Sequence, residues 1–372
     1  MTELTPYLNA LARHDGTDLY LTTGASPYAK FNGKMKALRD EPLKPGEVAA
    51  MAKRLMDAEQ QKLFEHDLEL NISLSLAGIG RFRVNIFHQR NQVSMVVRNI
   101  KMDIPDFKSL NLPSILQDTV MAKRGLLLFV GATGSGKSTS LAALIDYRNS
   151  LSMGHIVTIE DPVEFVHRHK KSVISQREVG VDTRSYHDAL DNILRQAPDV
   201  ILVGEIRDQV TMEHILNYAE TGHLVISCLN ANNANQAIDR IINFFPDSRR
   251  NQILQDLSNN LVCIACQRLL PTTTGGRIPA VEILLGTPRS KELIANGKIL
   301  QLKEAMEKSN TTGMQTFDQA LFALVREGKV DMEVAIHHAD SADNLRTKLK
   351  LNQGLINETK TNQAQRSSMR TH

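Results

Sequence analysis

The stretch "GLLLFVGATGSGKSTS", residues 125–140, joins an apolar run to a glycine-rich loop and then to a helical pattern. Residues 131–138 fit the phosphate-binding pattern G-x-x-x-x-G-K-[ST] at every position. Glycines in such a loop let backbone N–H groups face phosphate oxygens, and the helix that follows adds the positive end of its dipole. The sequence therefore predicts a strand, a phosphate-binding loop and a helix in that order, and with them an α/β fold.

Two side chains of this loop have separate expected roles. Lys137 is expected to reach the β- and γ-phosphates of ATP, and the hydroxyl of Ser138 is expected to bind Mg²⁺. The loop residues that we expect to contact ATP are Gly131, Ala132, Thr133, Gly134, Ser135, Gly136, Lys137, Ser138 and Thr139. The sequence has no N-K-x-D tetrapeptide for guanine, and no acceptor pocket of a small-molecule kinase can be located in it. ATP hydrolysis is therefore the favoured activity.

Beyond this loop, short apolar runs alternate with helical stretches, which is typical of a parallel sheet covered by helices. The runs are "GLLLFV", "HIVTI", "DVILV" and "HLVIS". From about residue 249 onward the sequence reads as mostly helical. Cys263 and Cys266 fall in this region, in a segment with helical apolar spacing. A zinc site would need a second C-x-x-C pair, which the sequence does not contain, so we expect buried free thiols.

The first hundred residues predict a small α+β domain. Two strands are expected in residues 18–35, with Asn32 and Gly33 as a tight turn, and a helix over about residues 45–65. Apolar residues alternate strictly over residues 68–76 and again after Gly80, which predicts two further strands. The stretch "VSMVVRNI" then completes a meander.

The domain boundaries follow from changes in composition. We expect an N-terminal domain over residues 1–100, a linker over residues 101–113 that contains two prolines, and an ATPase domain over residues 114–345. Residues 346–372 are expected to be a basic, partly disordered tail, because six Lys or Arg stand there against one Glu among polar residues.

Hydrolysis of ATP also needs an acid near the metal ion and a group that positions water. The stretch "HIVTIEDPVEF" ends an apolar run in Glu160 and Asp161, with Glu164 shortly after, and "DVILVGEIRD" ends another in Gly204 and Glu205. Acidic residues at the carboxyl ends of parallel strands lie on the ligand-binding edge of such a sheet. Both clusters are therefore candidates for the catalytic acids.

The composition excludes several classes of protein. With a net charge of +3 and 5% aromatic residues, the chain lacks the basic field of a dedicated DNA binder. No apolar run approaches the roughly 20 residues that a membrane span requires, and the start "MTELTPYLNA" has no signal-peptide pattern. Three cysteines make no disulfide framework. We therefore expect a cytosolic protein.

Four segments resemble, in order and spacing, the secretion-type ATPases of type IV pili. They are "GATGSGKSTS", "VTIEDPVEF", "QAPDVILVGEIRD" and "AETGHLVISCLNANNANQAIDRIINFFP". The resemblance covers residues 17–350 and points to the PilT/PilU branch of the type II/IV secretion ATPase (GspE) family, whose members serve pilus retraction and twitching motility. Extension ATPases usually carry a four-cysteine zinc insert and an additional N-terminal region, and their absence here favours retraction.

This resemblance implies a role for each acidic residue. Glu205 becomes the variant Walker B acid that acts on Mg²⁺ and its waters, and the stretch "IEDPVE" matches the Asp box of the family. Glu164 becomes the catalytic base, with Glu160 as the second choice, because both stand at the end of the same strand.

The resemblance also implies the architecture, which is an N-terminal PAS-like α+β domain joined to a RecA-like P-loop ATPase domain with a helical C-terminal part. In the N-terminal domain, Arg81 and Arg83 share one face of a strand, opposite Phe82 and Val84, and Arg98 lies on the following strand. From the residues alone this is a solvated basic face. In the family such arginines reach the γ-phosphate, a role that can supply roughly 10³ to 10⁵ in rate.

From the family we further expect a homo-hexamer in which each nucleotide site lies between two domains that close on ATP binding and reopen on hydrolysis. The implied partners are a PilT-type retraction ATPase and the pilus platform protein of the inner membrane. Nucleic acid is not among them. The implied location is the cytoplasm, peripheral at the inner face of the cytoplasmic membrane.

At Asn230 the sequence departs from the family, whose retraction ATPases carry a His in this position within the so-called His box. Asparagine can donate a hydrogen bond to a phosphate oxygen but cannot become a cation, so we expect slow turnover. Three other functions stay open from the sequence: a weakly hydrolysing switch for a partner motor, a nucleic-acid translocase and an extension motor.

Overall fold

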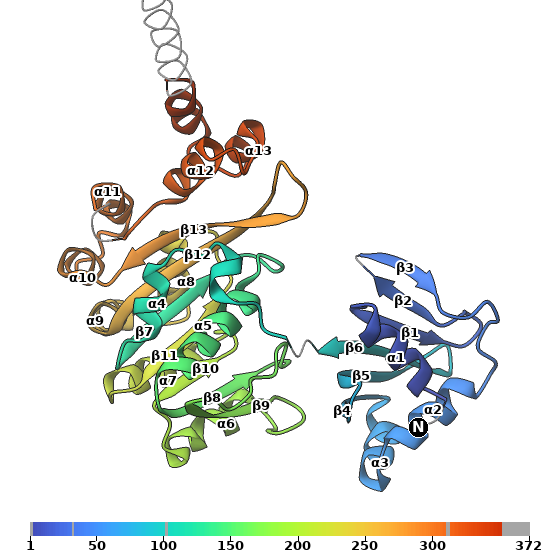
Figure 1. Cartoon of the computed structure of the whole chain (residues 1–372). Coiled ribbons are helices and arrows are strands. Elements are labelled where there is room, and N and C mark those ends of the chain that lie inside the picture. The colour runs from blue at the N-terminus through green and yellow to red at the C-terminus, as the bar shows by residue number, and fades with distance from the viewer. Residues whose placement is uncertain (1–2, 32, 101–102, 310–312, 352–372) are drawn as a thin grey trace, which may run out of the picture. The chain divides into compact units, whose positions relative to one another are not determined.

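The computed structural model describes residues 3–31, 33–100, 103–309 and 313–351. They form two compact units. The first comprises the residues up to Ile104 together with Ile159–Arg168 and Gln176–Asp191, and the second comprises Pro105–Thr158, His169–Ser175 and the chain from Asn192 onward. Figure 1 labels the helices and strands of both units.

A six-stranded antiparallel sheet, with strand order β3-β2-β1-β6-β5-β4, forms the centre of the first unit (Figure 1). Its strands are β1 (Asp18–Thr22), β2 (Tyr28–Phe31), β3 (Lys34–Ala37), β4 (Glu69–Leu76), β5 (Gly80–Gln89) and β6 (Gln92–Ile100). Its helices are α1 (Thr5–Arg13), α2 (Glu47–Leu55) and α3 (Ala58–Asp67). Leu11 of α1 and Val48 of α2 share a buried core with Phe82 and Val84 of β5.

The sequence predicted β4, β5 and β6 correctly, because strict alternation marks strands with one buried face. The region of the two predicted first strands contains three, since β2 and β3 form a hairpin around Gly33, whose φ is +80°. Its neighbour Asn32 lies outside the described residues. The single helix predicted over residues 45–65 was wrong, because Asp57 caps a new helix by accepting bonds from the backbone of Glu59 and Gln60.

A seven-stranded sheet, with strand order β13-β12-β7-β11-β10-β8-β9, runs through the second unit. Its strands are β7 (Gly125–Val130), β8 (Gly154–Glu160), β9 (Ser172–Glu178), β10 (Val200–Val203), β11 (Leu224–Leu229), β12 (Leu261–Pro271) and β13 (Arg277–Leu285). The pairs β10–β11, β11–β7 and β7–β12 are parallel, whereas β13 runs antiparallel to β12. The runs "GLLLFV", "HIVTI", "DVILV" and "HLVIS" all form strands as predicted.

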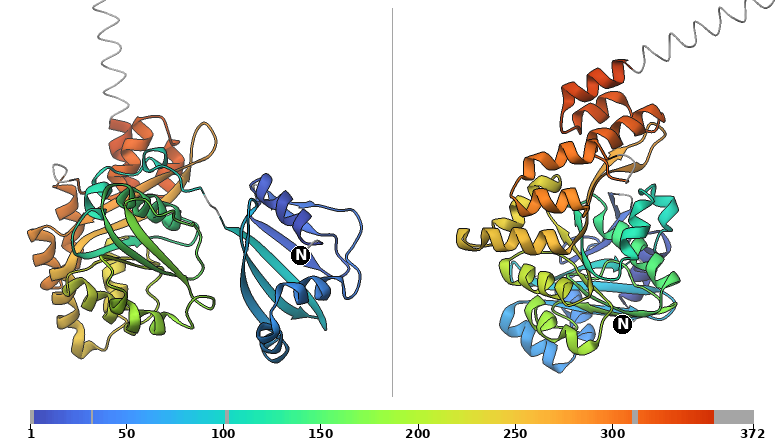
Figure 2. Two further views of the ribbon diagram at one scale, coloured as in Figure 1. Left: turned by 60° about the horizontal axis from the view of Figure 1, so that its bottom comes forward. Right: turned by 90° about the vertical axis from the view of Figure 1, so that its left-hand side faces the viewer.

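Helices cover both faces of this sheet, with α4 and α5 on one side and α8 and α9 on the other (Figure 2). The helices after the linker are α4 (Ile115–Val120), α5 (Lys137–Leu151), α6 (Tyr186–Ile193), α7 (Gln209–Glu220), α8 (Ala234–Ile242), α9 (Arg250–Asn260), α10 (Pro288–Ala295), α11 (Leu302–Glu307), α12 (Phe317–Arg326) and α13 (Met332–His337). Short 3₁₀ turns are η1 (Phe107–Leu110), η2 (Leu194–Gln196), η3 (Asp247–Arg249) and η4 (Ile299–Gln301). Among the described residues, no helix is long and apolar enough to cross a membrane.

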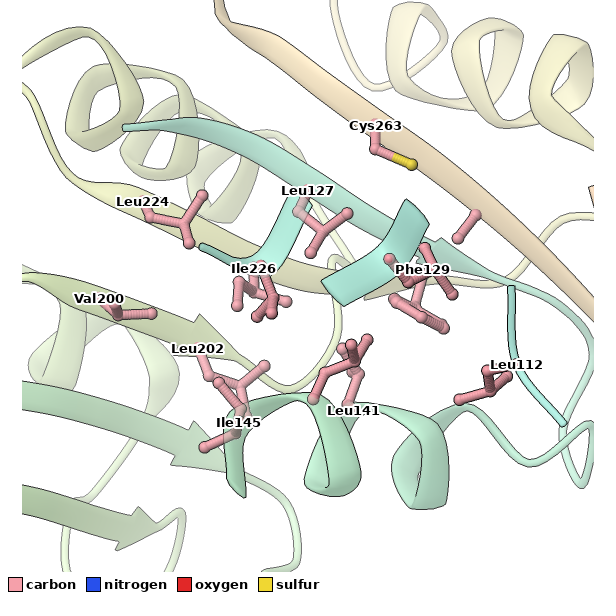
Figure 3. Packing of buried hydrophobic residues seen from close by; sticks show 14 of the residues in the cluster. Leu112, Leu127, Phe129, Leu141, Ile145, Val200, Leu202, Leu224, Ile226 and Cys263 are labelled. Carbon is pink, nitrogen blue, oxygen red and sulfur yellow. The ribbon is translucent and has the colours of Figure 1, made fainter. Parts of the chain in front are cut away.

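The core on the α5 side is built from the central strands. Leu127 and Phe129 of β7 and Ile226 of β11 pack against Leu141 and Ile145 of α5, all buried (Figure 3). All six residues of β7 are buried, as is typical of a central parallel strand with both faces covered. This packing fixes the strand and the helix that flank the predicted phosphate loop.

The prediction of a mostly helical region after residue 249 was wrong at β12 and β13. The apolar run of β12 has no clear period, because the strand is buried on both faces, so it resembles a helix in sequence. Its pairing with β7 shifts between Leu261 and Cys263, which makes Val262 a β-bulge. Cys263 and Cys266 are buried free thiols as predicted.

The predicted boundaries of linker and tail fall within structured segments. Phe107 and Leu112 of the expected linker are buried in the core of the second unit. Residues 342–351 are helical and run across the expected boundary at residue 346, with Leu349 buried. The rest of the predicted basic tail, residues 352–372, lies outside the described residues.

Candidate nucleotide-binding site

The parallel strands bring the segments that the sequence singled out to one edge of the sheet. In the registers of β7, β10 and β11, Val130 pairs with Leu229, and Val203 pairs with Ser227. Gly131 and Asn230 directly follow β7 and β11, and Glu205 comes two residues after β10, so all three lie at the same edge. This edge is where ligands bind in open α/β sheets.

The loop over residues 131–136 has a backbone that only glycine permits at key positions. A Cβ at position 131 would lie 2.5 Å from Ser135 Oγ and 2.6 Å from the carbonyl oxygen of Gln267. Gly136 has a φ of +87° and precedes the first residue of α5. Gly131 N donates to the carbonyl oxygen of Leu229 at 3.2 Å. These constraints hold the loop against the sheet and direct its exposed residues 132–134 outward.

A buried glutamine, which the sequence did not reveal, supports this loop from the neighbouring strand. Gln267 of β12 is 2% exposed, and its Nε2 donates to the carbonyl oxygen of Ser135 at 2.8 Å. Its Oε1 accepts from Ser140 Oγ of α5, also at 2.8 Å. The amide thus ties the loop, the helix and the strand together. No local pattern could identify it, because its partners lie more than a hundred residues away.

Lys137 lies at the start of α5, and its ammonium group is fully hydrogen-bonded within the protein. Its Nζ donates to the carbonyl oxygen of Gly131 at 2.6 Å, to that of Ala132 at 3.0 Å and to Oδ1 of Asn230 at 3.2 Å. An ammonium group has three hydrogens, so these oxygens use them all. A phosphate oxygen that binds Lys137 must replace one of them.

Asn230 connects the loop to the acidic residue predicted for Mg²⁺. Its Nδ2 donates to Oε1 of Glu205 in a short hydrogen bond, while Glu205 Oε2 accepts from Nε of Arg207 at 2.9 Å. Because Lys137 only donates and ionised Glu205 only accepts, the amide of Asn230 can face in one orientation alone. Lys137, Asn230, Glu205 and Arg207 therefore form one continuous network, as expected for side chains of a common site.

The donor set fits a nucleotide and its magnesium ion. Ser135 Oγ is buried under the loop and makes no hydrogen bond to any described residue, and the loop N–H groups are the donors that phosphates require. The hydroxyl of Ser138 and the carboxylate of Glu205 are hard oxygen ligands of the kind that Mg²⁺ prefers. The described residues contain no group of three or more His, Cys, Asp or Glu for a metal. Mg²⁺ needs none, since one or two carboxylates and phosphate oxygens suffice.

The residues of the Asp box belong to the first unit. Glu160 ends β8 half-buried and accepts from Nε2 of Gln176 at 3.1 Å, whereas Glu164 is exposed. A further acid, Glu178, was missed by the sequence reasoning. It is 1% exposed and accepts from the backbone N–H of Val163 at 3.2 Å, so it holds the segment immediately before Glu164.

The three arginines of the N-terminal domain are placed as the sequence predicted. Arg83 pairs directly with Arg98 across β5 and β6, while Phe82 and Val84 are buried on the opposite face. Arg98 forms an ion pair with Asp18 at 2.9 Å. Arg83 lies 3.7 Å from Asp161, and Arg81 has a buried Nε with no hydrogen-bond partner among the described residues. Their function stays a prediction.

Glu282 of β13 anchors the helix that follows Asn230. Its Oε1 accepts from the backbone N–H of Ala234, the first residue of α8, at 2.8 Å. Burial raises the pKa of Glu282 to about 7 against the opposing effect of this hydrogen bond. A carboxyl group thus holds the loop of Asn230 from its far end.

The fold and this site define a P-loop ATPase, and comparisons with known proteins identify its family. Residues 30–278 match the family model described as type II/IV secretion system protein, so the chain belongs to that family. The expected fold class is confirmed: α/β, with a PAS-like N-terminal α+β domain and a RecA-like P-loop ATPase domain that has a helical C-terminal part.

Within this family the chain groups with the ATPases of type IV pilus retraction. It is 49% identical over 350 residues to the type IV pilus ATPase PilU of Pseudomonas aeruginosa, covering 94% of this chain and 92% of PilU. It is 38% identical to the type IV pilus retraction ATPase PilT of the same organism, covering 92% and 99% of the two chains. The crystal structure of the pilus retraction motor PilT with bound ADP superimposes with a TM-score of 0.85 at 40% identity, covering 91% and 98%. The chain is an ATPase related to type IV pilus retraction, and the predicted family is correct.

The raised pKa of Glu282 predicts a stability that depends on pH. The folded carboxyl holds its proton up to about pH 7, whereas in the unfolded chain it releases the proton near the ordinary value of 4.5. The folded state therefore binds more protons between these values, and its stability falls as the pH rises through about 7. Glu282→Gln keeps an acceptor for Ala234 but cannot titrate. Melting temperatures measured from pH 5 to 8 should fall more steeply with pH in the wild type than in the variant, and parallel curves would contradict the assignment.

Proposed function

We propose that this chain is an ATP-hydrolysing hexameric motor that powers or assists type IV pilus retraction and twitching motility. The observation that carries the proposal is the network from Lys137 through Asn230 to Glu205 beside the phosphate loop. It joins a phosphate-binding cation to a metal-binding acid through a residue at the tip of a central strand. The kinship with PilU and PilT supplies the biological process.

In this proposal the loop of residues 131–139 binds ATP, and Ser138 and Glu205 hold Mg²⁺. The ion, when bound, would neutralise charge on the β- and γ-phosphates. Lys137 would turn from the loop carbonyls to the phosphates and add its own charge there. Glu164 acts as the base that positions and deprotonates water, with Glu160 as the second candidate. The greater exposure of Glu164 favours it over the half-buried Glu160.

Arg81, Arg83 and Arg98 are proposed to reach the γ-phosphate. The buried Nε of Arg81 without a described partner supports this role, because an unpaired buried donor is costly unless a ligand satisfies it. Changes of each arginine to Ala should lower kcat more than nucleotide affinity. Unchanged turnover in all three variants would indicate that these arginines form only a solvated basic face.

Each nucleotide site of the hexamer is proposed to lie between two domains, so that ATP binding closes one domain on the other and hydrolysis reopens them. This motion would pull pilin subunits from the fibre base through the platform protein of the inner membrane, at whose cytoplasmic side the ring would sit. The kinship with PilU supports an accessory role beside a PilT-type motor. A second candidate function is a weakly hydrolysing switch for such a motor. Asn230 favours it, because its amide is hydrogen-bonded to both Lys137 and Glu205.

The first test is Lys137→Ala. Removal of the ammonium group takes away the charge that Lys137 would place on the phosphates, so ATP hydrolysis and pilus retraction should be lost while the fold survives. Lys308→Ala is the matched control, because Lys308 is exposed and, among the residues that the structure describes, forms a surface ion pair with Glu304. Steady-state ATPase assays and twitching assays measure both variants. Wild-type turnover in Lys137→Ala would refute the nucleotide site.

The second test separates the two acids of the Asp box. Glu164→Gln should leave ATP binding intact and slow hydrolysis by roughly 10² to 10⁴, the usual effect of removing a general base. Glu160→Gln should be milder. Binding of a fluorescent ATP analogue and single-turnover hydrolysis report the two effects separately. A larger loss in Glu160→Gln would show that the base is Glu160.

The third test is Asn230→His. Where Asn230 now donates to Glu205, a protonated imidazole could donate a charge-assisted bond, which is roughly twice as strong as a neutral one. The carboxylate of Glu205 favours the protonated ring and the ammonium of Lys137 opposes it, so the gain should depend on pH. We expect a higher kcat without much tighter ATP binding. Steady-state ATPase kinetics of the wild type and the variant at several pH values test this expectation. Equal kcat at every pH would show that Asn230 does not cause slow turnover.

A further inference from the structure

Arg268 of β12 bonds to two parts of the second unit that are far apart in sequence. Its Nη2 donates to the carbonyl oxygen of Asn232 at 3.0 Å, in the segment of residues 230–233 that we name the sensor loop. The same nitrogen donates to Oδ1 of Asp340 at 2.6 Å, and Nη1 donates to the carbonyl oxygen of His338 at 2.5 Å. Residues 338–340 lie between α13 and the helix of residues 342–351.

The sensor loop has few other attachments near Asn232. The backbone N–H of Asn232 donates to Gln236 Oε1 at 3.2 Å, a bond within the same segment, and Glu282 holds Ala234 at the start of α8. Arg268 is thus the side chain from β12 that fixes the backbone two residues after Asn230. Since the amide of Asn230 bridges Lys137 and Glu205, the placement of this backbone decides how the amide meets them.

Arg268 also contacts the C-terminal helices, which comprise α12, α13 and residues 342–351. Its guanidinium lies 3.8 Å from the ring centroid of Phe317 at the start of α12. Asp340 in turn donates its backbone N–H to Oδ1 of Asp318 of α12 at 2.8 Å. Lys303 lies 3.6 Å from Asp318 and 3.9 Å from Asp340, so it balances their charges. A displacement of the Arg268 guanidinium would therefore also displace the residues of the C-terminal helices that contact it.

The geometry requires arginine in particular. A guanidinium has five N–H donors in a fixed plane, so one side chain can serve Asn232, His338 and Asp340 at once and still stack on Phe317. A lysine has a single nitrogen at the end of a flexible chain and cannot hold the same acceptors in this arrangement. The side chain is half-buried, at 21% exposure, so its polar contacts are partly shielded from water.

We propose that Arg268 is a positioning residue for ATP turnover that couples the sensor loop to the C-terminal helices. A change at Asn230 on nucleotide binding shifts Asn232, and Arg268 passes this shift to residues 338–340. The coupling is reciprocal, so a partner that binds the C-terminal helices would alter turnover through the same side chain. This inference rests on the proposed function, because it takes Asn230 to contact the nucleotide.

The test is amide hydrogen exchange of the full-length protein, with and without ADP, in wild type and in Arg268→Ala. In the wild type, ADP should slow exchange both in the peptide of the sensor loop and in residues 332–351. In Arg268→Ala the loop should still respond and the C-terminal helices should not. ATPase kinetics should show kcat lowered by roughly two- to thirtyfold, the range that coupling residues contribute, with KM little changed. Arg277→Ala is the matched control, an exposed arginine on the neighbouring strand β13.

Two further variants keep the test decisive if Arg268→Ala does not fold. Arg268→Lys retains the charge and should not restore the response of the C-terminal helices. Asp340→Asn leaves Arg268 bonded to Asn232 and should weaken the C-terminal response alone. A C-terminal response that persists in these variants, or that is absent in the wild type although its sensor loop responds, would overturn the coupling. A wild-type loop that does not respond to ADP would instead overturn the nucleotide site, and the coupling with it.

Discussion

The parallel pairing of β7 with β11 determines where the side chains of the site can lie. The register runs without interruption from Gly125 opposite Leu224 to Val130 opposite Leu229, and the strands bury nearly all of their side chains on both faces. A slip of one residue would exchange the side chains that are packed on the two faces of the sheet, so the close packing on each face specifies this register. The two strands therefore end at the same level, and the phosphate loop and Asn230 emerge side by side. Because both strands end at the same level, the side chains of Lys137 and Asn230 can contact each other.

The sequence allowed good prediction wherever the chemistry is local. The phosphate loop, its flanking strand and helix, and the acids after β8 and β10 could be located because the pattern of each lies within about ten residues. The break between α2 and α3 was missed, since the capping of Asp57 competes with a helical pattern that continues through it. β12 was missed because burial on both faces removes the period that distinguishes a strand from a helix. Gln267 and Arg268 were missed for another reason, because all their partners are distant in the chain.

The buried polar side chains of β12 and β13 restrict the elements around them to a single arrangement. Gln267 and Glu282 are almost fully buried, and each has its polar atoms bonded to backbone or side chains of neighbouring elements. Burial of such groups costs free energy that their hydrogen bonds only partly offset, so apolar residues could pack here with less cost. Polar groups, however, accept only one arrangement of donors and acceptors. In this chain Gln267 holds the phosphate loop and Glu282 holds Ala234, at the end of the sensor loop, so both loops are fixed at the same edge of the sheet.

The β-bulge at Val262 determines which side chains of β12 face α5 and which face the C-terminal helices. Successive side chains of a strand point to opposite faces, so Gln267 reaches α5 while Arg268 reaches the C-terminal helices. Val262 is the one extra residue that sets this alternation against β7. Loss of a single residue between the bulge and Gln267 would bring the guanidinium beneath the phosphate loop and turn the amide toward the helices. The segment should therefore accept many replacements of one amino acid by another but no change in length, so that insertions and deletions among related chains are expected to fall outside residues 262–268.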